Sequence, residues 1–244
     1  MELWGISDSG RVRRQNQDIF KYLIDNDRDV ALVVVCDGMG GARAGDVASA
    51  IAAEEFMRCM WKHVDQVDDR DVIASNMSDA VQSANRAVYE KSLRNPELSG
   101  MGTTLTAVIS TSSGLVIVNV GDSRVYHITL KGIKQITKDH SVVEDMISKG
   151  NINRSEARRH PKKNLITRAL GINSHEELDV FFLRLKPDEY ILLCTDGLSN
   201  VVMDSEILFQ MQSGGSVREC CEKLVGTALS RGAPDNVTAV LFKK

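Results

Sequence analysis

Apolar runs rich in Val, Ile and Thr mark the predicted strands of this chain. Runs of this kind, bounded by turn-forming residues, are typical of buried β-strands. They predict strands at 30–36, 104–110, 114–120, 124–129, 179–184, 190–195 and 237–242. Three of them lie in TLTAVISTSSGLVIVNVGDSRVYHI, joined by the turn sequences Ser-Ser-Gly and Gly-Asp-Ser. Because connections this short join antiparallel neighbours, we predict a meander in this segment.

A second periodicity, with apolar residues three and four positions apart, predicts helices. These helices are expected at 45–63, 69–93, 141–149 and 216–230. The first two are consecutive and precede the meander. Helices grouped apart from antiparallel strands indicate an α+β fold, here a layered α-β-β-α sandwich, and argue against a doubly wound parallel sheet.

The chain shows no internal division. Its 244 residues contain no repeat, low-complexity tract or Pro/Ser-rich linker, so we predict a single domain at 1–244. Between two predicted strands lies a charged, partly helical insertion at 141–168. Insertions of this kind often gate access to a site, and we expect a mobile flap there.

Composition narrows the partners and the compartment. A hydrophobic share of 43% and a net charge of −3 are ordinary for a globular protein and give no reason to expect nucleic acid or an anionic membrane as a partner. The N-terminus lacks the basic and apolar regions of a secretion signal, and no apolar run approaches the ~18–20 residues that span a bilayer. Five cysteines without C-x-x-C spacing disfavour a disulfide framework or a zinc site. We therefore expect a cytoplasmic monomer with buried thiols at Cys36 and Cys194.

A local basic cluster surrounds His160. It consists of Arg158, Arg159, Lys162 and Lys163. Such a run is most often a solvated face, and the alternative is a docking site for an acidic or phosphorylated substrate.

Aspartates stand at the ends of four predicted strands. Asp37 follows VALVVVC and precedes Gly-Met-Gly-Gly, Asp122 follows LVIVNVG, Asp196 follows YILLCT, and Asp235 precedes Asn-Val-Thr-Ala-Val. A fifth, Asp18, lies in the polar cluster Asn-Gln-Asp before IFKYLI, a segment with strand character. Any single Asp-Gly or Gly-Asp is most often only a turn signal. Four of them carry more weight, because the strands of one sandwich bring their ends to a common rim.

Convergence of these carboxylates would call for cations. Two unit charges ~5 Å apart at an effective dielectric constant of ~20 repel by about 3 kcal/mol. Ligands that are all oxygen favour hard ions, Mg²⁺ or Mn²⁺, over zinc. Glycines around Asp37 would let the backbone turn sharply and bring a carbonyl to an ion. The residues therefore indicate a divalent-cation site.

These segments together resemble the type-2C (PPM) family of metal-dependent serine/threonine protein phosphatases. The matching motifs run nearly end to end and in the order of the family: SDSGRVRRQNQD, VVVCDGMGGARAGDVAS, GTTLTAVI, VGDSRVY, ITKDHSVV, ITRALG, LLCTDGLSN and APDNVTAVLF. The size of the chain and the segment 139–171 resemble the compact bacterial members that oppose serine/threonine kinases. The resemblance implies two central antiparallel sheets flanked by helices, and hydrolysis of phosphoserine and phosphothreonine in proteins.

The resemblance also implies roles for the aspartates. Asp37 would bridge two Mn²⁺ or Mg²⁺ ions, with a backbone carbonyl from Gly38. Asp196 and Asp235 would complete the shell of the first ion, and Asp18 would hold a metal-bound water. A third ion would lie at Asp122 together with Asp196.

Two further positions concern the substrate. Arg13 aligns with the arginine that grips the substrate phosphate, although as a residue of the run Arg11-Arg13-Arg14 it could equally be a solvated surface side chain. Some members of the family carry a histidine two residues after the bridging aspartate, assigned as the general acid. This chain has Met39 there, so another group must protonate the leaving oxygen.

The residues also bear on three alternative functions. A cysteine-dependent phosphatase needs cysteine and arginine separated by five residues, whereas Cys36 and Arg43 are separated by six. A binding module that kept the fold and lost its ligands is disfavoured because Asp37, Asp196 and Asp235 are all present. A third alternative keeps the activity but makes the substrate a phosphoprotein of a stress or sporulation pathway. The main expectation is a phosphatase whose partners are phosphoproteins, namely a serine/threonine kinase and its targets.

Overall fold

Two antiparallel sheets form the centre of the protein. The computed structural model describes residues 1–63 and 69–243, with the main chain alone at 41–43. The five-stranded sheet has the order β1-β11-β10-β7-β8, with β1 at Glu2–Asp8, β7 at Arg124–Thr129, β8 at Gly132–Gln135, β10 at Tyr190–Cys194 and β11 at Val237–Lys243. The six-stranded sheet has the order β2-β3-β5-β6-β9, with β2 at Asp18–Asp25, β3 at Val30–Met39, β5 at Leu105–Thr111, β6 at Gly114–Val120 and β9 at Asp179–Leu183. A short strand, β4 (Gly102–Thr103), pairs with the end of β3.

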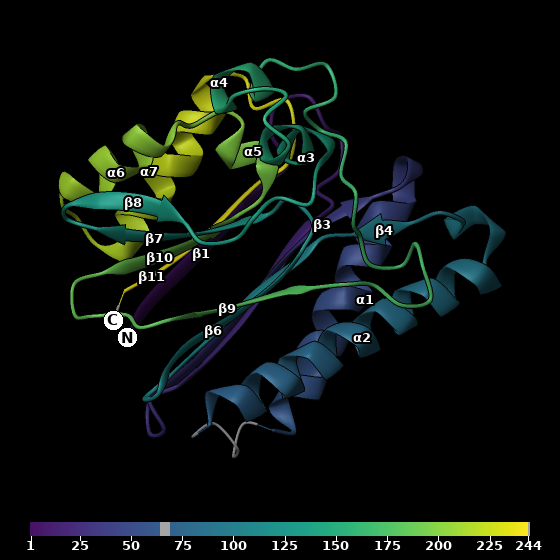
Figure 1. Cartoon of the computed structure of the whole chain (residues 1–244), viewed down its shortest axis with the longest axis horizontal. Helices are drawn as coiled ribbons and strands as arrows, with labels where there is room; N and C mark the ends of the chain where they lie inside the picture. The colour runs from purple at the N-terminus through teal and green to yellow at the C-terminus, as the bar shows by residue number, and fades with distance from the viewer. Residues whose placement is uncertain (64–68, 244) are drawn as a thin grey trace.

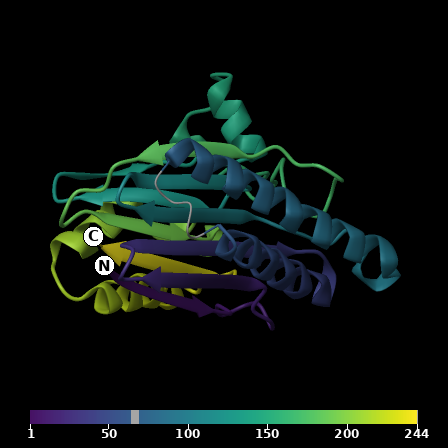
Figure 2. The same cartoon turned by 90° about the horizontal axis from the view of Figure 1, so that it is seen from below.

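Helices cover the outer face of each sheet (Figures 1 and 2). The six-stranded sheet carries α1 (Gly41–Trp61) and α2 (Arg70–Arg94), followed by the 3₁₀ turn η1 (Pro96–Leu98). The five-stranded sheet carries α5 (Asp196–Ser199), α6 (Asp204–Gln212) and α7 (Val217–Ser230). The insertion before β9 contains α3 (Val142–Ser148) and α4 (Arg154–Ala157). The predicted four-layer α-β-β-α sandwich is confirmed, and none of the described helices has the length and apolar character to cross a membrane.

Successive side chains of β3 pack on opposite faces of the sheet, so this one strand contacts both the helices and the second sheet. Val34 and Cys36 belong to the cluster that packs against α1 and α2, whereas Val33 and Val35 belong to the cluster between the two sheets. All four side chains have no exposed surface. Since a fully buried valine stabilises the fold by about 1.5–3 kcal/mol, this strand is fixed firmly, and so is the position of its end.

The predicted strands and the four predicted helices are present, with ends shifted by a few residues. The structure adds elements that the sequence patterns did not predict: β1, β8, η1, α4, α5 and α6. Strand β3 also continues past the predicted end at 36, because Gly38 and Met39 pair with Thr103 and Gly102 of β4. Asp37 therefore lies within a strand, where hydrogen bonds on both sides fix its main chain.

The predicted meander is wrong at its second turn. Strands β5 and β6 pair as expected, but β7 pairs with β10 and β8 in the other sheet. The chain crosses from one sheet to the other at Gly121–Ser123, where Gly121 has a φ of 106°, a conformation that favours glycine. A short turn between two strands thus joins the layers instead of closing a hairpin, and Asp122 lies on that crossing.

Candidate active site between the two sheets

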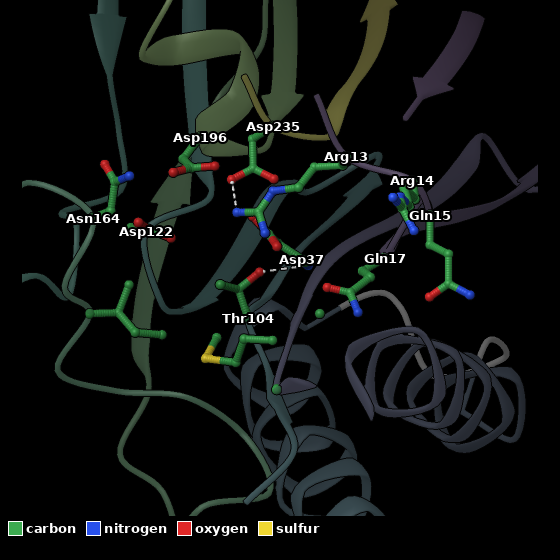
Figure 3. Close-up of a pocket in the computed structure, with 14 residues that line it drawn as sticks. Arg13, Arg14, Gln15, Gln17, Asp37, Thr104, Asp122, Asn164, Asp196 and Asp235 are labelled. Carbon is green, nitrogen blue, oxygen red and sulfur yellow. Dashed lines mark hydrogen bonds and ion pairs between the residues drawn. The ribbon is translucent and has the colours of Figure 1, made fainter. Parts of the chain in front are cut away.

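A pocket of about 510 Å³ opens where strand ends of both sheets meet (Figure 3). Six of the seven predicted site residues line it: Arg13, Asp37, Gly38, Asp122, Asp196 and Asp235. They come from the β1–β2 loop, the end of β3, the β6–β7 crossing, the start of α5 and the residues before β11. The seventh, Asp18, pairs with Asp37 across β2 and β3. The fold thus brings together residues that lie more than 200 positions apart.

The electrostatics of Asp37 show how closely the acids gather. Burial raises the pKa of its carboxyl well above the usual range. The charges of the other four predicted aspartates raise it further, in the order Asp18, Asp196, Asp122 and Asp235. Each of them must lie near enough for its negative charge to act on Asp37, so the five carboxyl groups surround one small volume.

Asp18 is held across the gap between the sheets. Its Oδ2 accepts hydrogen bonds from the hydroxyls of Thr195 at 2.8 Å and Thr238 at 2.7 Å, both from the five-stranded sheet. Its Oδ1 is buried and has no partner. Burial raises the pKa of Asp18 to about 7, although the two hydroxyls oppose the rise. A buried carboxylate oxygen without a donor is costly unless something binds it, which is the situation expected of a residue that serves a cation or its water.

Asp196 and Asp122 occupy the other side of the pocket. Asp196 begins α5, and its Oδ2 accepts a hydrogen bond of 3.0 Å from Asn200. Burial and then the charge of Asp235 raise the pKa of Asp196 to about 6. Burial and then the charge of Asp196 raise the pKa of Asp122 well above its usual range. These two carboxylates therefore form a second pair of neighbouring acids beside Asp37.

Arg13 reaches into the same pocket from the β1–β2 loop. Its NH2 group donates to Oδ2 of Asp235 at 2.9 Å, and the side chain is 55% exposed. The loop is held by Asn236, whose side chain donates to the carbonyls of Ser9 and Gln15 and accepts from the N–H of Gln17, each at 2.9 Å. Arg13 is thus placed by a built loop, which argues against a freely solvated surface side chain.

Gly38 and Gly40 shape the backbone beside Asp37. A Cβ on Gly38 would come within 2.0 Å of the carbonyl oxygen of Gly45 in α1, so only glycine lets the helix start this close to the strand. Gly40 has a φ of 119°, which lets the chain leave β3 and enter α1 immediately. The glycines that suggested a sharp turn in the sequence therefore serve close packing at one position and the turn at the other.

His140 binds the crossing between the sheets and does not cap α3. Ser141 caps α3, while His140 is buried and its Nδ1 accepts the N–H of Gly121 at 3.1 Å. The main-chain N–H of His140 donates to the carbonyl of Gly121 at 2.9 Å. His140 thus binds the main chain of the crossing that carries Asp122.

The insertion at 141–168 borders the pocket through Asn164 and Ile166. An isolated antiparallel bridge between Ser141 and Ile166 closes its base. In Figure 1, α3 and α4 of this insertion lie near α5 at the top of the molecule. The predicted helical insertion is present, while its mobility stays a prediction.

The basic cluster around His160 divides between two tasks. Arg158 approaches Asp204 of α6 at 3.7 Å, which ties the insertion to the five-stranded side of the protein. Lys163 lines a smaller cavity of about 140 Å³ beside Asp122 and Asp196, and its charge lowers the pKa of Asp196. The sequence pattern marked the cluster as basic but did not place Lys163 next to the acids.

The cysteines take no part in the pocket. Cys36 and Cys194 are buried, as predicted, and all five cysteines are free thiols. Burial raises the pKa of Cys36 far above its ordinary value, so it stays protonated and a poor nucleophile. The side chain of Arg43, the other half of the rejected cysteine mechanism, lies outside the described side chains.

The pocket fits divalent cations by its donors and not by a ready-made cluster. Within residues 1–63 and 69–243, no three acidic, histidine or cysteine side chains form a compact group around one ion position. Asp37, Asp122, Asp196 and Asp235 instead line one shared pocket. Their oxygens, with the unpartnered Oδ1 of Asp18, form a donor set suited to Mg²⁺ or Mn²⁺.

Comparison with known proteins gives the family. The model of the protein phosphatase 2C family matches residues 10–231. The chain is 36% identical to the serine/threonine phosphatase stp of Listeria monocytogenes, over 98% of this chain and 94% of that protein. It is 30% identical to the protein phosphatase PhpP of Streptococcus pneumoniae, over 99% and 96%.

Solved structures agree with this result. The serine/threonine phosphatase Stp1 from Staphylococcus aureus superposes with a TM-score of 0.92 at 33% identity, over 100% of this chain and 94% of that one. The catalytic domain of the serine/threonine protein phosphatase PstP, solved in complex with two manganese ions, superposes with a TM-score of 0.81 at 35% identity, over 98% and 96%. The chain therefore belongs to the protein phosphatase 2C family and is a serine/threonine protein phosphatase of the bacterial kind.

Proposed function

We propose that this phosphatase removes phosphate from phosphoserine and phosphothreonine at the aspartate pocket, with two or three Mn²⁺ or Mg²⁺ ions. Asp37 would bridge two ions with help from the carbonyl of Gly38. Asp196 and Asp235 would complete the ligands of the first ion, Asp18 would bind through water, and Asp122 with Asp196 would hold the third ion. The observation that carries this assignment is the gathering of the other four carboxylates around Asp37 at one pocket, where their charges add to the effect of burial on its pKa.

The cations would supply an activated water and would neutralise charge on the phosphoryl oxygens. The chain itself would orient the substrate. Arg13 uses one N–H on Asp235, and its exposed side chain has further donors that can hold two phosphate oxygens through the planar guanidinium. Met39 lines the pocket where some relatives carry a histidine, and no histidine lines it in the described part of the chain. Protonation of the leaving oxygen would then fall to water or to a pocket carboxyl.

We also propose that the substrates are a serine/threonine kinase and its targets, in the cytoplasm. Two considerations support this setting. The relatives named above are serine/threonine phosphatases that match almost the whole chain. Five free cysteines are typical of a reducing compartment.

Hydrolysis of a phosphothreonine peptide and of p-nitrophenyl phosphate tests the proposal. Each substrate is assayed with Mn²⁺, Mg²⁺, Zn²⁺ or a chelator. We expect turnover with Mn²⁺ or Mg²⁺ and none with chelator. Full activity in chelator would contradict the metal assignment, and hydrolysis of the small ester without the peptide would contradict the substrate class.

A further inference from the structure

Thr104 contacts both the main chain of Asp37 and the turn that carries Asp122. It is 1% exposed and lies on the six-stranded sheet beside the pocket. Its Oγ1 accepts the N–H of Asp37 at 2.9 Å, and its own N–H donates to the carbonyl of Asp37 at 2.9 Å. The main chain of Asp37 is therefore bonded in both directions to this residue.

The same hydroxyl reaches the Asp122 turn. Thr104 Oγ1 lies 2.9 Å from Oγ of Ser123, which has no exposed surface, and either hydroxyl can donate. The methyl group of Thr104 packs against Gly121, where a Cβ would come within 2.5 Å of it. Thr104 thus touches the residues on both sides of Asp122. His140 also binds the main chain of Gly121.

This arrangement matters because the turn is a crossing between sheets. No ladder of strand hydrogen bonds continues from β6 into β7, since the two strands lie in different sheets. The strand ladder β3-β5-β6 ends at Val120, two residues before Asp122. Beyond it, the Thr104–Ser123 hydroxyl pair links the residue that holds the main chain of Asp37 to the turn that carries Asp122.

We propose that Thr104 and Ser123 are positioning residues, which hold Asp37 and Asp122 in a fixed relation so that both carboxylates are aligned for cations. The inference rests on the metal assignment proposed above. Groups that orient metal ligands without touching the metal typically account for about 10–100-fold in metal affinity, so loss of this pair should weaken binding.

Isothermal titration of the full chain with Mn²⁺ tests the proposal, and the affinity itself is the readout. Ser123→Ala keeps the bond from Asp37 to Thr104 and should weaken Mn²⁺ binding by about 10-fold, at the low end of this range. Thr104→Val keeps the shape but leaves the N–H of Asp37 without an acceptor, and should weaken binding by about 10–100-fold. Thr104→Ser should restore most of the affinity because it keeps the hydroxyl.

A double-mutant cycle separates the pair from two independent residues. Thr104→Val with Ser123→Ala should bind Mn²⁺ no more weakly than Thr104→Val alone, because both changes break the same bond. Ser110→Ala is the matched control: Ser110 is a buried serine of β5, the strand that begins directly after Thr104, its hydroxyl has no partner, and its loss should leave the affinity unchanged.

The outcomes distinguish failure of the positioning role from failure of the metal assignment. Wild-type affinity in both Ser123→Ala and Thr104→Val, or additive losses in the double variant, would overturn the positioning role. Asp37→Asn is titrated alongside, and wild-type affinity in that variant would overturn the metal assignment itself. If Thr104→Val does not fold, Ser123→Ala and Thr104→Ser still decide the question.

Discussion

On the scale of single residues, uncharged side chains hold several of the pocket acids in place through hydrogen bonds. Hydroxyls of Thr195 and Thr238 bind Asp18, and Thr104 binds the main chain of Asp37. Such bonds fix a carboxylate without cancelling its charge, whereas an ion pair would do both. The pocket therefore keeps negative charge available for cations.

Asp37→Asn should lower kcat by at least ~10³-fold, about 4 kcal/mol of transition-state stabilisation, because it removes the charge on which the other four acids converge. Steady-state hydrolysis of a phosphothreonine peptide in Mn²⁺ measures the effect. Asp79→Asn, at an exposed position of α2, is the control and should be silent. A tenth of wild-type turnover in Asp37→Asn would contradict the assignment.

Cys36→Ser should leave kcat within a few-fold of wild type. The thiol lies in the core between β3 and the helices, and burial keeps it protonated. The cost should fall on stability instead, by about 1–3 kcal/mol, because the new hydroxyl is buried in apolar surroundings. Peptide hydrolysis and thermal unfolding measure the two effects, and a folded but inactive variant would revive the cysteine mechanism.

Acidic residues next to strands could be predicted as site residues. The residues that hold them in place by hydrogen bonds could not. Asp37, Asp122, Asp196 and Asp235 stand beside apolar runs, which the sequence displays directly. The donors that hold Asp18 come from positions 195 and 238, and only the folded chain brings them to it. Thr104 stood in a recognisable Gly-Thr-Thr motif, but its neighbours in the sequence suggested no role beyond packing.

On the scale of elements, the β1–β2 loop is fixed by one buried amide. Asn236 forms three hydrogen bonds to the main chain of residues 9–17, which present Arg13 to the pocket. A loop bonded in this way can hold an arginine in a productive geometry at little entropic cost on binding.

Asn236→Ala should therefore raise KM for small phosphoesters and lower kcat, as Arg13→Ala should, because the arginine loses its support. Steady-state kinetics on p-nitrophenyl phosphate measures both constants in the single variants and the double variant. If Asn236 acts through Arg13, the double variant should be no worse than Arg13→Ala alone. Fully additive losses would show that Asn236 acts by another route.

Long elements could be predicted from periodicity, and short or edge elements could not. Four-residue helices such as α4 and α5 are too short to show a helical period, and β1 at the sheet edge is only partly buried, so its pattern is weak. The second turn of the predicted meander failed for another reason. A three-residue connection permits a hairpin, but only the packing of both sheets decides that β7 joins the other layer.

On the scale of the whole molecule, the pocket lies at the seam between the sheets. Asp18 belongs to one sheet and its two hydroxyl donors to the other. A cation bound there would be held by both layers, so its binding energy would also oppose their separation.

Saturating Mn²⁺ should raise Tm by roughly 5–10 °C over protein in chelator. An ion bound only by the native state adds about 2.7 kcal/mol at a hundredfold excess over its Kd, and each kcal/mol moves Tm by ~2–4 °C in a domain of this size. Differential scanning calorimetry of wild type and Asp37→Asn, each with and without Mn²⁺, measures the shift. Asp37→Asn should lose most of the Mn²⁺ increment and gain some stability in chelator, because one repelling charge is gone. Equal shifts in the two proteins would show that the ion binds elsewhere.

In chelator, stability should fall as the pH rises from about 4 to about 7. Burial raises the pKa of Asp18 to about 7 and that of Asp196 to about 6, above their values in the unfolded chain. The folded protein therefore binds more protons in this window, and raising the pH favours unfolding. Thermal unfolding in chelator at pH 5, 6, 7 and 8 measures the slope, which Asp18→Asn should flatten. A Tm that rises over this range in wild type would contradict the expected direction.

The pairing of β1 with β11 has a consequence for synthesis on the ribosome. Ser7 and Thr238, which share a hydrogen bond in this pairing, are 231 positions apart. At ~5–20 residues per second, β1 waits roughly 10–50 s after it is made before its partner strand exists. The same delay separates Arg13 from Asp235, so a nascent chain that stops short of β11 has neither a closed five-stranded sheet nor a complete pocket. The enzyme should thus acquire activity only late in synthesis, after β11 has been made.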